Sequence, residues 1–166
     1  KLQPDRIIGL DISPGMLEVG KQKMKKKEID SLVEMVLGDS EDLAYGDNSI
    51  DAVTVGFGVR NFENLEKGMS EILRVLKPGK AAAILEPAIP RRFPMRQLFY
   101  LYFRGILPLI GKLVSKDNAA YTYLPESVKA FPDGKEFTDI CRKVGFRKAE
   151  YKPLSLGICS MYLLEK

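Results

Sequence analysis

Short apolar runs alternate with amphipathic segments along the first half of the chain. The runs cover residues 6–10, 33–37, 50–57 and 81–85, and the run at 50–57 is nearly continuous. An unbroken apolar run is typical of a parallel strand that is buried on both faces, so we expect strand 50–57 to be central in its sheet. Helices are predicted to begin at Ser13-Pro14 and to cover 65–76, where Asn64 or Asn61 can cap the helix.

This alternation predicts an α/β fold with a mostly parallel, doubly wound sheet. Ligands bind such sheets outside the carboxyl ends of the strands. The residues that follow the strands should therefore line one edge of the sheet: Asp11, Asp39, Gly56 to Asn61 and Glu86.

The pattern changes after residue 87. Residues 91–114 are rich in Phe, Tyr and Leu and are interrupted at Pro108, so we expect 88–132 to be a helical insertion that covers the site as a lid. Helices are predicted at 125–130 and 133–144, and the strands near 146–151 and 158–164 should form a closing antiparallel pair.

Composition limits the chemistry that the chain can perform. With 166 residues, 45% of them hydrophobic, the chain has room for one soluble domain over 1–166. A net charge of +4 is too mild to indicate a nucleic-acid partner. The chain has no histidine, and Cys141 and Cys159 are far apart, so we expect no metal site and no Ser-His-Asp or Cys-His catalysis. Unpaired cysteines fit a cytoplasmic protein.

Two acidic residues follow neighbouring predicted strands. Asp11 stands where a carboxylate can accept hydrogen bonds from both ribose hydroxyls of a nucleotide-like cofactor, a feature that NAD and S-adenosylmethionine sites share. Asp39, followed by Ser40, stands where an adenine amino group would be recognised. Each has a plainer interpretation, since Asp is also common at helix caps and Gly-Asp-Ser in turns.

Several longer motifs carry a family resemblance. The strand-end acids and the segment Leu76-Lys77-Pro78-Gly79-Lys80 resemble class I S-adenosylmethionine-dependent methyltransferases. Within that class, the chain resembles the ubiquinone/menaquinone biosynthesis C-methyltransferase family over essentially all of its residues. The motifs that carry this likeness are Gly56-Phe57-Gly58-Val59-Arg60-Asn61, Leu85-Glu86-Pro87, Tyr121-Thr122-Tyr123-Leu124-Pro125-Glu126-Ser127 and Phe131-Pro132. The resemblance implies a Rossmann-like fold and S-adenosyl-L-methionine as the cofactor.

The resemblance also implies a cofactor site. It places the cofactor's ribose on Asp11, next to Ile12, and its adenine near Asp39 and Ser40. It places the backbone of Gly56 beside the cofactor, at a position where family members often have Ser.

Catalytic roles follow from the same resemblance. Arg60 and Asn61 are expected to orient a quinol oxygen and to stabilise phenolate charge, while Tyr121 and Tyr123 contact the ring or pack in the lid. A salt bridge within the loop is the alternative for Arg60. Glu86 is interpreted as a base, an orienting group or a structural carboxylate.

One family element has no counterpart in the sequence. The glycine-rich loop of the family and the strand before it are expected to precede Lys1, and no Gly-x-Gly-x-x-Gly match is present. In the family's sheet order that strand lies between strands 6–10 and 50–57. We therefore expect two unpaired central edges, and residues 1–166 alone to be unstable or inactive.

The function that these motifs imply is C-methylation of a demethylmenaquinol or a related prenylated quinol. A methyltransferase for another lipidic acceptor, such as a sterol or tocopherol precursor, stays open, as does a non-catalytic fragment. A nicotinamide-dependent dehydrogenase would explain Asp11 but not Asp39 or Leu76-Lys77-Pro78-Gly79. Menaquinone and ubiquinone precursors are not distinguished.

Basic and bulky apolar residues are interleaved over 91–107, and this stretch is too charged to span a bilayer. It suits either a packed lid or peripheral contact with the inner face of the cell membrane, where anionic headgroups attract arginine. Nothing in the sequence decides whether the protein forms a homodimer.

Overall fold

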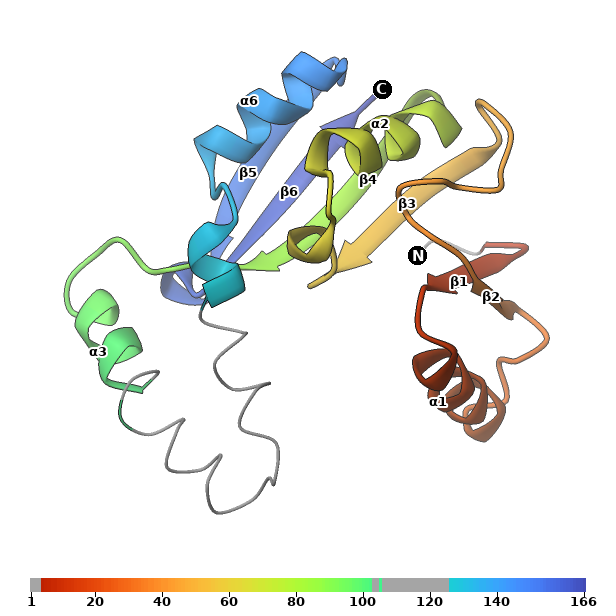
Figure 1. Cartoon of the computed structure of the whole chain (residues 1–166), viewed down its shortest axis with the longest axis horizontal. Helices are drawn as coiled ribbons and strands as arrows, with labels where there is room; N and C mark the ends of the chain where they lie inside the picture. Colours follow the sequence, from red (N-terminus) through yellow and green to blue (C-terminus); the bar gives the residue numbers. More distant parts are fainter. Residues whose placement is uncertain (1–3, 103–104, 106–125) are drawn as a thin grey trace.

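The computed structural model describes residues 4–102, 105 and 126–166 of the chain. Its strands form two separate sheets (Figure 1). The first sheet pairs β1 (Ile7–Asp11) with β2 (Val33–Leu37) in parallel. The second has the order β3-β4-β6-β5 and is built from β3 (Ile50–Gly56), β4 (Leu76–Pro87), β5 (Lys148–Leu154) and β6 (Cys159–Glu165).

Strand directions agree with the predicted fold class. β3 runs parallel to β4, whereas β6 runs antiparallel to both β4 and β5. The parallel α/β architecture and the closing antiparallel pair are therefore confirmed. β4 begins earlier than the apolar run at 81–85 because Leu76 already pairs with Ile50.

The expectation that strand 50–57 is central was wrong for the described residues. β3 is an edge strand of its sheet, and its residues Asp51, Ala52, Thr54 and Gly56 are exposed. β1 likewise pairs on one side alone within the described ranges. Figure 1 shows the β1–β2 pair on the β3 side of the four-stranded sheet, and β1 and β3 each keep one unpaired edge within the described ranges.

The helices begin at the predicted caps. Ser13 caps α1 (Pro14–Lys26), and its Oγ accepts a hydrogen bond from the Met16 amide at 3.4 Å. Asn64 caps α2 (Leu65–Val75), and its Oδ1 accepts one from the Lys67 amide at 3.0 Å. The further elements are the 3-10 turn η1 (Val59–Asn61), α3 (Met95–Leu101), α6 (Lys135–Val144) and the 3-10 turn η3 (Ser155–Gly157).

The core lies between the four-stranded sheet and the helices α2 and α6, which run along one side of it (Figure 1). Met69 and Ile72 of α2 and Phe137 of α6 pack there against Tyr162 and Leu164 of β6. α1 packs instead against the β1–β2 pair. No helix in the described ranges is long and apolar enough to cross a membrane.

Arg74 of α2 joins the segment that follows β2 to the four-stranded part of the fold. Its guanidinium donates hydrogen bonds to the carbonyl oxygens of Leu43 and Tyr45 at 2.8 and 2.7 Å. It also pairs with both carboxylate oxygens of Glu71 at 2.7 Å and with Asp47 at 2.8 Å. Glu71 in turn accepts a hydrogen bond from the Leu43 amide at 2.8 Å. Hydrogen bonding to Arg74 lowers the pKa of Glu71 below its ordinary value.

We expect Arg74→Ala to lower the melting temperature by about 5 °C, because it removes all the hydrogen bonds that the guanidinium donates. Arg74→Lys should recover little, since an ammonium group cannot reproduce the planar fork. Thermal unfolding followed by circular dichroism measures the effect. Arg6→Ala is the control, because it removes an exposed pair with Glu34 and should change the melting temperature little. Equal melting temperatures for Arg74→Ala and Arg6→Ala would contradict this role.

Candidate active site

Asp11 closes β1 and keeps one carboxylate oxygen for a ligand. Its Oδ1 accepts a hydrogen bond from the Ser13 amide at 2.8 Å, which fixes the side chain beside the start of α1. Its Oδ2 takes no hydrogen bond from the described residues. Ile12, which follows, is 71% exposed, so an apolar surface lies next to this carboxylate.

Asp39 lies at the same edge as Asp11. The two strands are parallel with Asp11 opposite Leu37, and the Gly38 amide donates to the Asp11 carbonyl at 3.1 Å. Asp39 repeats the arrangement of Asp11, because its Oδ1 accepts from the Glu41 amide at 2.8 Å while Oδ2 takes no hydrogen bond from the described residues. The structure therefore brings together the predicted residues Asp11, Ile12, Asp39 and Ser40.

Gly56 ends β3 with open space beside it. A Cβ built on Gly56 would meet no atom within 4 Å, and the backbone there is not in the left-handed region. Neither turn geometry nor packing within the described chain thus explains the glycine. The space is consistent with the close approach of a cofactor to the backbone.

We expect Gly56→Ile to fold with a melting temperature within about 3 °C of the wild type, because nothing in the described chain crowds the position. The same variant should weaken cofactor binding at least about tenfold, since the new side chain occupies the open space. Isothermal calorimetry gives the affinity. Gly56→Ser is the matched small variant and should bind within about threefold of the wild type. Full affinity in Gly56→Ile would place the cofactor away from this residue.

Arg60 and Asn61 lie in the turn η1, directly after β3. The Phe57 amide donates to the Leu85 carbonyl at 2.8 Å, so the start of this turn lies against the end of β4. Arg60 is largely covered, with 12% of its side chain exposed, and Nη1 donates to the Phe57 carbonyl. Asn61 is exposed on the same turn. Both predicted residues therefore stand at the carboxyl edge of the sheet, whereas Tyr121 and Tyr123 lie outside the described residues.

Glu86 is the fully buried partner of Arg60. Its Oε2 accepts from Arg60 Nη1 at 3.1 Å and its Oε1 accepts from the Val59 amide at 2.7 Å. Burial raises the pKa of Glu86 above its ordinary value, although the hydrogen bonds from Arg60 and Val59 act in the opposite direction. Arg60 thus forms a salt bridge, but its partner lies on β4 and not within its own loop, as the alternative interpretation had it.

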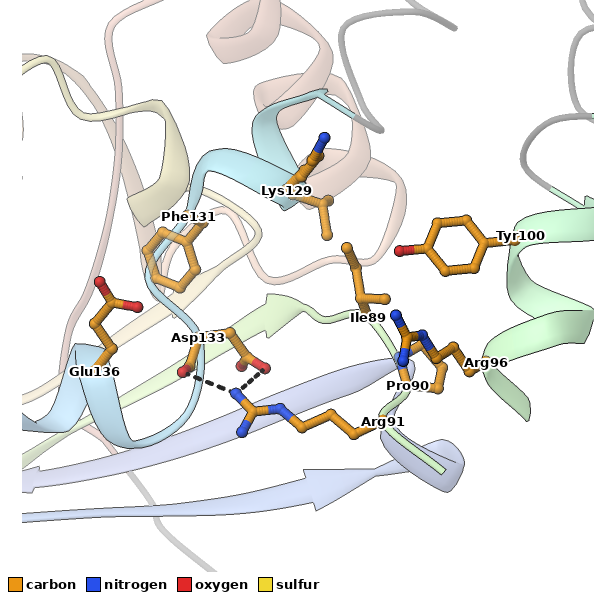
Figure 2. A pocket seen from close by; sticks show the side chains of 10 residues that line it. Ile89, Pro90, Arg91, Arg96, Tyr100, Lys129, Phe131, Asp133 and Glu136 are labelled. Atoms are coloured by element: carbon orange, nitrogen blue, oxygen red, sulfur yellow. Dashed lines mark hydrogen bonds and ion pairs between the residues drawn. The ribbon is translucent and has the colours of Figure 1, made fainter. Parts of the chain in front are cut away.

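A hollow of about 490 Å³ opens beyond the end of β4. Ile89, Pro90 and Phe131 form apolar parts of its wall. Figure 2 shows Tyr100 and Arg96 reaching it from α3, on the side opposite Phe131 and Asp133. Because it adjoins the last residues of β4, the hollow lies at the edge where α/β sheets bind ligands.

The wall of this hollow contains a hydrogen-bond cluster that sequence reasoning missed. Asp133 Oδ1 accepts from Ser160 Oγ at 2.8 Å and from Tyr162 Oη at 2.7 Å, and Tyr162 Oη accepts from the Gly134 amide at 2.8 Å. Arg91 lies 3.7 Å from Asp133 (Figure 2). Burial raises the pKa of Tyr162, so this hydroxyl stays neutral. Two sequence features point to this cluster. Pro132-Asp133-Gly134 is a typical turn sequence, and strand alternation puts residues 160 and 162 on one face of β6.

Comparison with known proteins gives these residues a context. A model of the ubiE/COQ5 methyltransferase family matches residues 3–166. The chain belongs to this family. S-adenosylmethionine is therefore the cofactor of this methyltransferase, and the fold that the sequence predicted is confirmed.

Two relatives and one solved structure show how far the likeness extends. A demethylmenaquinone methyltransferase of Bacteroides fragilis is 46% identical over the whole chain, which covers 68% of that protein. Another protein of that name, from Chlorobaculum tepidum, is 42% identical over the whole chain, which covers 66% of it. A methyltransferase structure from Aquifex aeolicus matches 96% of this chain and 68% of its own with a TM-score of 0.66; at 17% identity it shows the fold alone.

The residues at the sheet edge fit the cofactor. The carboxylate of Asp11, with Oδ2 uncommitted, suits a pair of ribose hydroxyls, and that of Asp39 suits an amino group. The open space at Gly56 leaves room for close backbone contact. In the methyltransferase these three residues and Ser40 would hold the cofactor, which supplies an electrophilic methyl group when bound.

Proposed function

We propose that this methyltransferase adds a methyl group to a ring carbon of demethylmenaquinol or a closely related prenylated quinol. The observation that carries the proposal is the name shared by relatives 46% and 42% identical over the whole chain, demethylmenaquinone methyltransferase. The position of Arg60 at the carboxyl edge of β3 supports the same chemistry.

A hydroquinone needs little from the protein beyond alignment and charge stabilisation. Loss of a phenol proton places negative charge on an oxygen and, by conjugation, on the adjacent ring carbon. That carbon can then form the new C–C bond as the methyl–sulfur bond breaks, and the ring regains aromaticity when the carbon loses its proton. A fixed positive group beside the oxygen favours the phenolate and lowers the barrier.

Arg60 is the group that we assign to this task. Nη1 is committed to Glu86 and to the Phe57 carbonyl, and Nε is buried without a hydrogen-bond partner among the described residues. A guanidinium carries five N–H donors, and Nη2 makes no hydrogen bond to the described residues, so Arg60 keeps donors for an acceptor oxygen. Asn61 follows on the same turn and can help to orient that oxygen.

An acceptor panel tests the proposal. Full-length protein is supplied with S-adenosylmethionine that carries a labelled methyl group, and with demethylmenaquinol, a sterol precursor or a tocopherol precursor in turn. Label should pass to demethylmenaquinol with a kcat/KM at least about 100-fold above that for the other two acceptors. Cofactor binding without transfer to any quinol would refute the proposed substrate.

The surface of α3 supports a second proposal, contact with the membrane in which a prenylated quinol dissolves. α3 buries none of its residues, and Leu98 and Leu101 are 52% and 63% exposed. Phe93, which lies two residues before the helix, is 81% exposed. Arg91, Arg92 and Arg96 are exposed in the same stretch. Exposed apolar side chains beside arginine suit the boundary between headgroups and acyl chains.

We expect the protein to sediment with vesicles that contain 30% phosphatidylglycerol about tenfold more than with neutral phosphatidylcholine vesicles. Phe93→Ser/Leu101→Ser should lower the bound fraction on anionic vesicles about tenfold, because each change removes an insertable side chain. Tyr151→Ser is the control, since it alters an exposed side chain on β5. Equal sedimentation of the double variant and the wild type would refute membrane contact through α3.

A further inference from the structure

Glu86 has a position that fold stability alone does not explain. Its side chain is completely buried at the end of β4, and both carboxylate oxygens face the turn after β3. Removing a carboxylate from water costs free energy that an ion pair recovers only in part, so a buried pair is weak evidence for a stabilising role. An apolar residue would fill the same volume at lower cost.

The turn that Glu86 holds is conformationally demanding. Phe57 has a φ of 59°, a value that is unfavourable for an aromatic residue and that persists only where surrounding contacts enforce it. Glu86 Oε1 binds the Val59 amide two residues later, and Val59 is buried. The carboxylate therefore fixes the backbone from which Arg60 projects.

Glu86 also fixes the guanidinium itself. Oε2 binds Arg60 Nη1, and the Phe57 carbonyl accepts from the same nitrogen, so the Nη1 end of the guanidinium is held by the protein. Nε is buried and finds no partner among the described residues. Nε lies too deep for a ligand to reach, but Nη2 makes no hydrogen bond to the described residues and 12% of the side chain is exposed. This second nitrogen can therefore receive a further acceptor atom while Nη1 stays fixed.

We propose that Glu86 is a positioning residue for methyl transfer, an inference that rests on the proposed function. Glu86 holds Arg60 and the Phe57–Asn61 turn so that the free guanidinium donors meet the acceptor oxygen. Glu86 acts through Arg60 and contacts no reacting atom itself. Its replacement should therefore affect turnover through Arg60 and leave cofactor affinity unchanged.

A double-mutant cycle tests this dependence. Glu86→Gln retains the side-chain volume and an oxygen for the Val59 amide, but it loses the charge that Arg60 faces. We expect Glu86→Gln to lower kcat about 30-fold when it is the only substitution, and less than about threefold when it is added to Arg60→Ala. The Kd for S-adenosylmethionine should stay within about twofold of the wild-type value in all three variants. Equal losses of kcat in both backgrounds would overturn the proposal.

The matched control is Glu71→Gln. Like Glu86, Glu71 is a largely covered carboxylate that binds an arginine and a backbone amide: it pairs with Arg74 at 2.7 Å and accepts from the Leu43 amide at 2.8 Å. This variant should lose stability while its kcat stays within about twofold of the wild type. If the control lowers kcat as much as Glu86→Gln does, the loss follows from removing any covered carboxylate, and the proposed positioning role is refuted.

A spectroscopic measurement keeps the positioning claim separate from the substrate claim. In the cofactor-free protein, hydrogen exchange of the Arg60 Nε–H, followed by ¹⁵N NMR, should be slow in the wild type and in Glu71→Gln and at least about tenfold faster in Glu86→Gln. If Glu86→Gln does not fold, Glu86→Asp replaces it in both experiments, because the shorter carboxylate cannot reach both partners. Unchanged exchange would show that Glu86 does not hold Arg60. Absence of quinol methylation with fast exchange in the variant would refute the proposed function alone.

Discussion

Arg60→Ala is expected to lower kcat for quinol methylation by about 100- to 1000-fold, the usual effect of removing a donor that stabilises developing negative charge. The Kd for S-adenosylmethionine should stay within about twofold, because Arg60 binds Glu86 and the Phe57 carbonyl and none of the residues that would hold the cofactor. Arg60→Lys should recover only part of the loss, since an ammonium group cannot bind Glu86 and an acceptor with the same fork.

Single-turnover methyl transfer and calorimetry separate the two quantities for Arg60→Ala. Arg147→Ala is the control, because it removes an exposed ion pair with Glu165 at the end of β6. It should change neither the rate of methyl transfer nor the Kd for the cofactor. Equal losses of turnover and of cofactor affinity in Arg60→Ala would make Arg60 a residue of the cofactor site or of the fold.

Asp11→Ala should raise the Kd for S-adenosylmethionine by about 100-fold, which corresponds to about 2.7 kcal/mol and to the loss of charge-assisted hydrogen bonds to the ribose. Asp11→Asn should lose about tenfold, because an amide oxygen still accepts from the Ser13 amide while the negative charge is gone. kcat at saturating cofactor should change little in either variant.

Calorimetry with S-adenosylmethionine and with NAD measures the effect of Asp11. The control is Asp30→Ala, which alters an exposed acid on the loop before β2. Unchanged affinity in Asp11→Ala would confine Asp11 to its hydrogen bond with Ser13, the plainer interpretation of an acid at this position.

The elements that local chemistry specifies could be predicted from the sequence. Ser13 and Asn64 cap their helices through side-chain oxygens, and Asp11 and Asp39 follow parallel neighbouring strands and so meet at one edge. These features depend on residues close in the sequence or on a single strand pairing. They need no knowledge of long-range packing.

The features that the sequence left undetermined depend on distant partners. Glu86 and Arg60 stand 26 residues apart, and Asp133 and Tyr162 stand 29 apart, so their pairing follows from sheet register and not from local pattern. The burial of strand 50–57 was misjudged for the same reason. An apolar run predicts a buried strand, but strand pairing decides which edges are covered, and β3 pairs on one side alone in the described chain.

The position of the new methyl group in the product distinguishes methylation of a ring carbon from methylation of a ring oxygen. Full-length protein, demethylmenaquinol and S-adenosylmethionine with a ¹³C-labelled methyl group are incubated under reducing conditions, and the product is examined by ¹³C NMR and mass spectrometry. We expect one labelled methyl on a ring carbon, in the chemical-shift range of an aryl methyl group. A labelled methoxy carbon, or labelled cofactor bound with no labelled quinol formed, would contradict it.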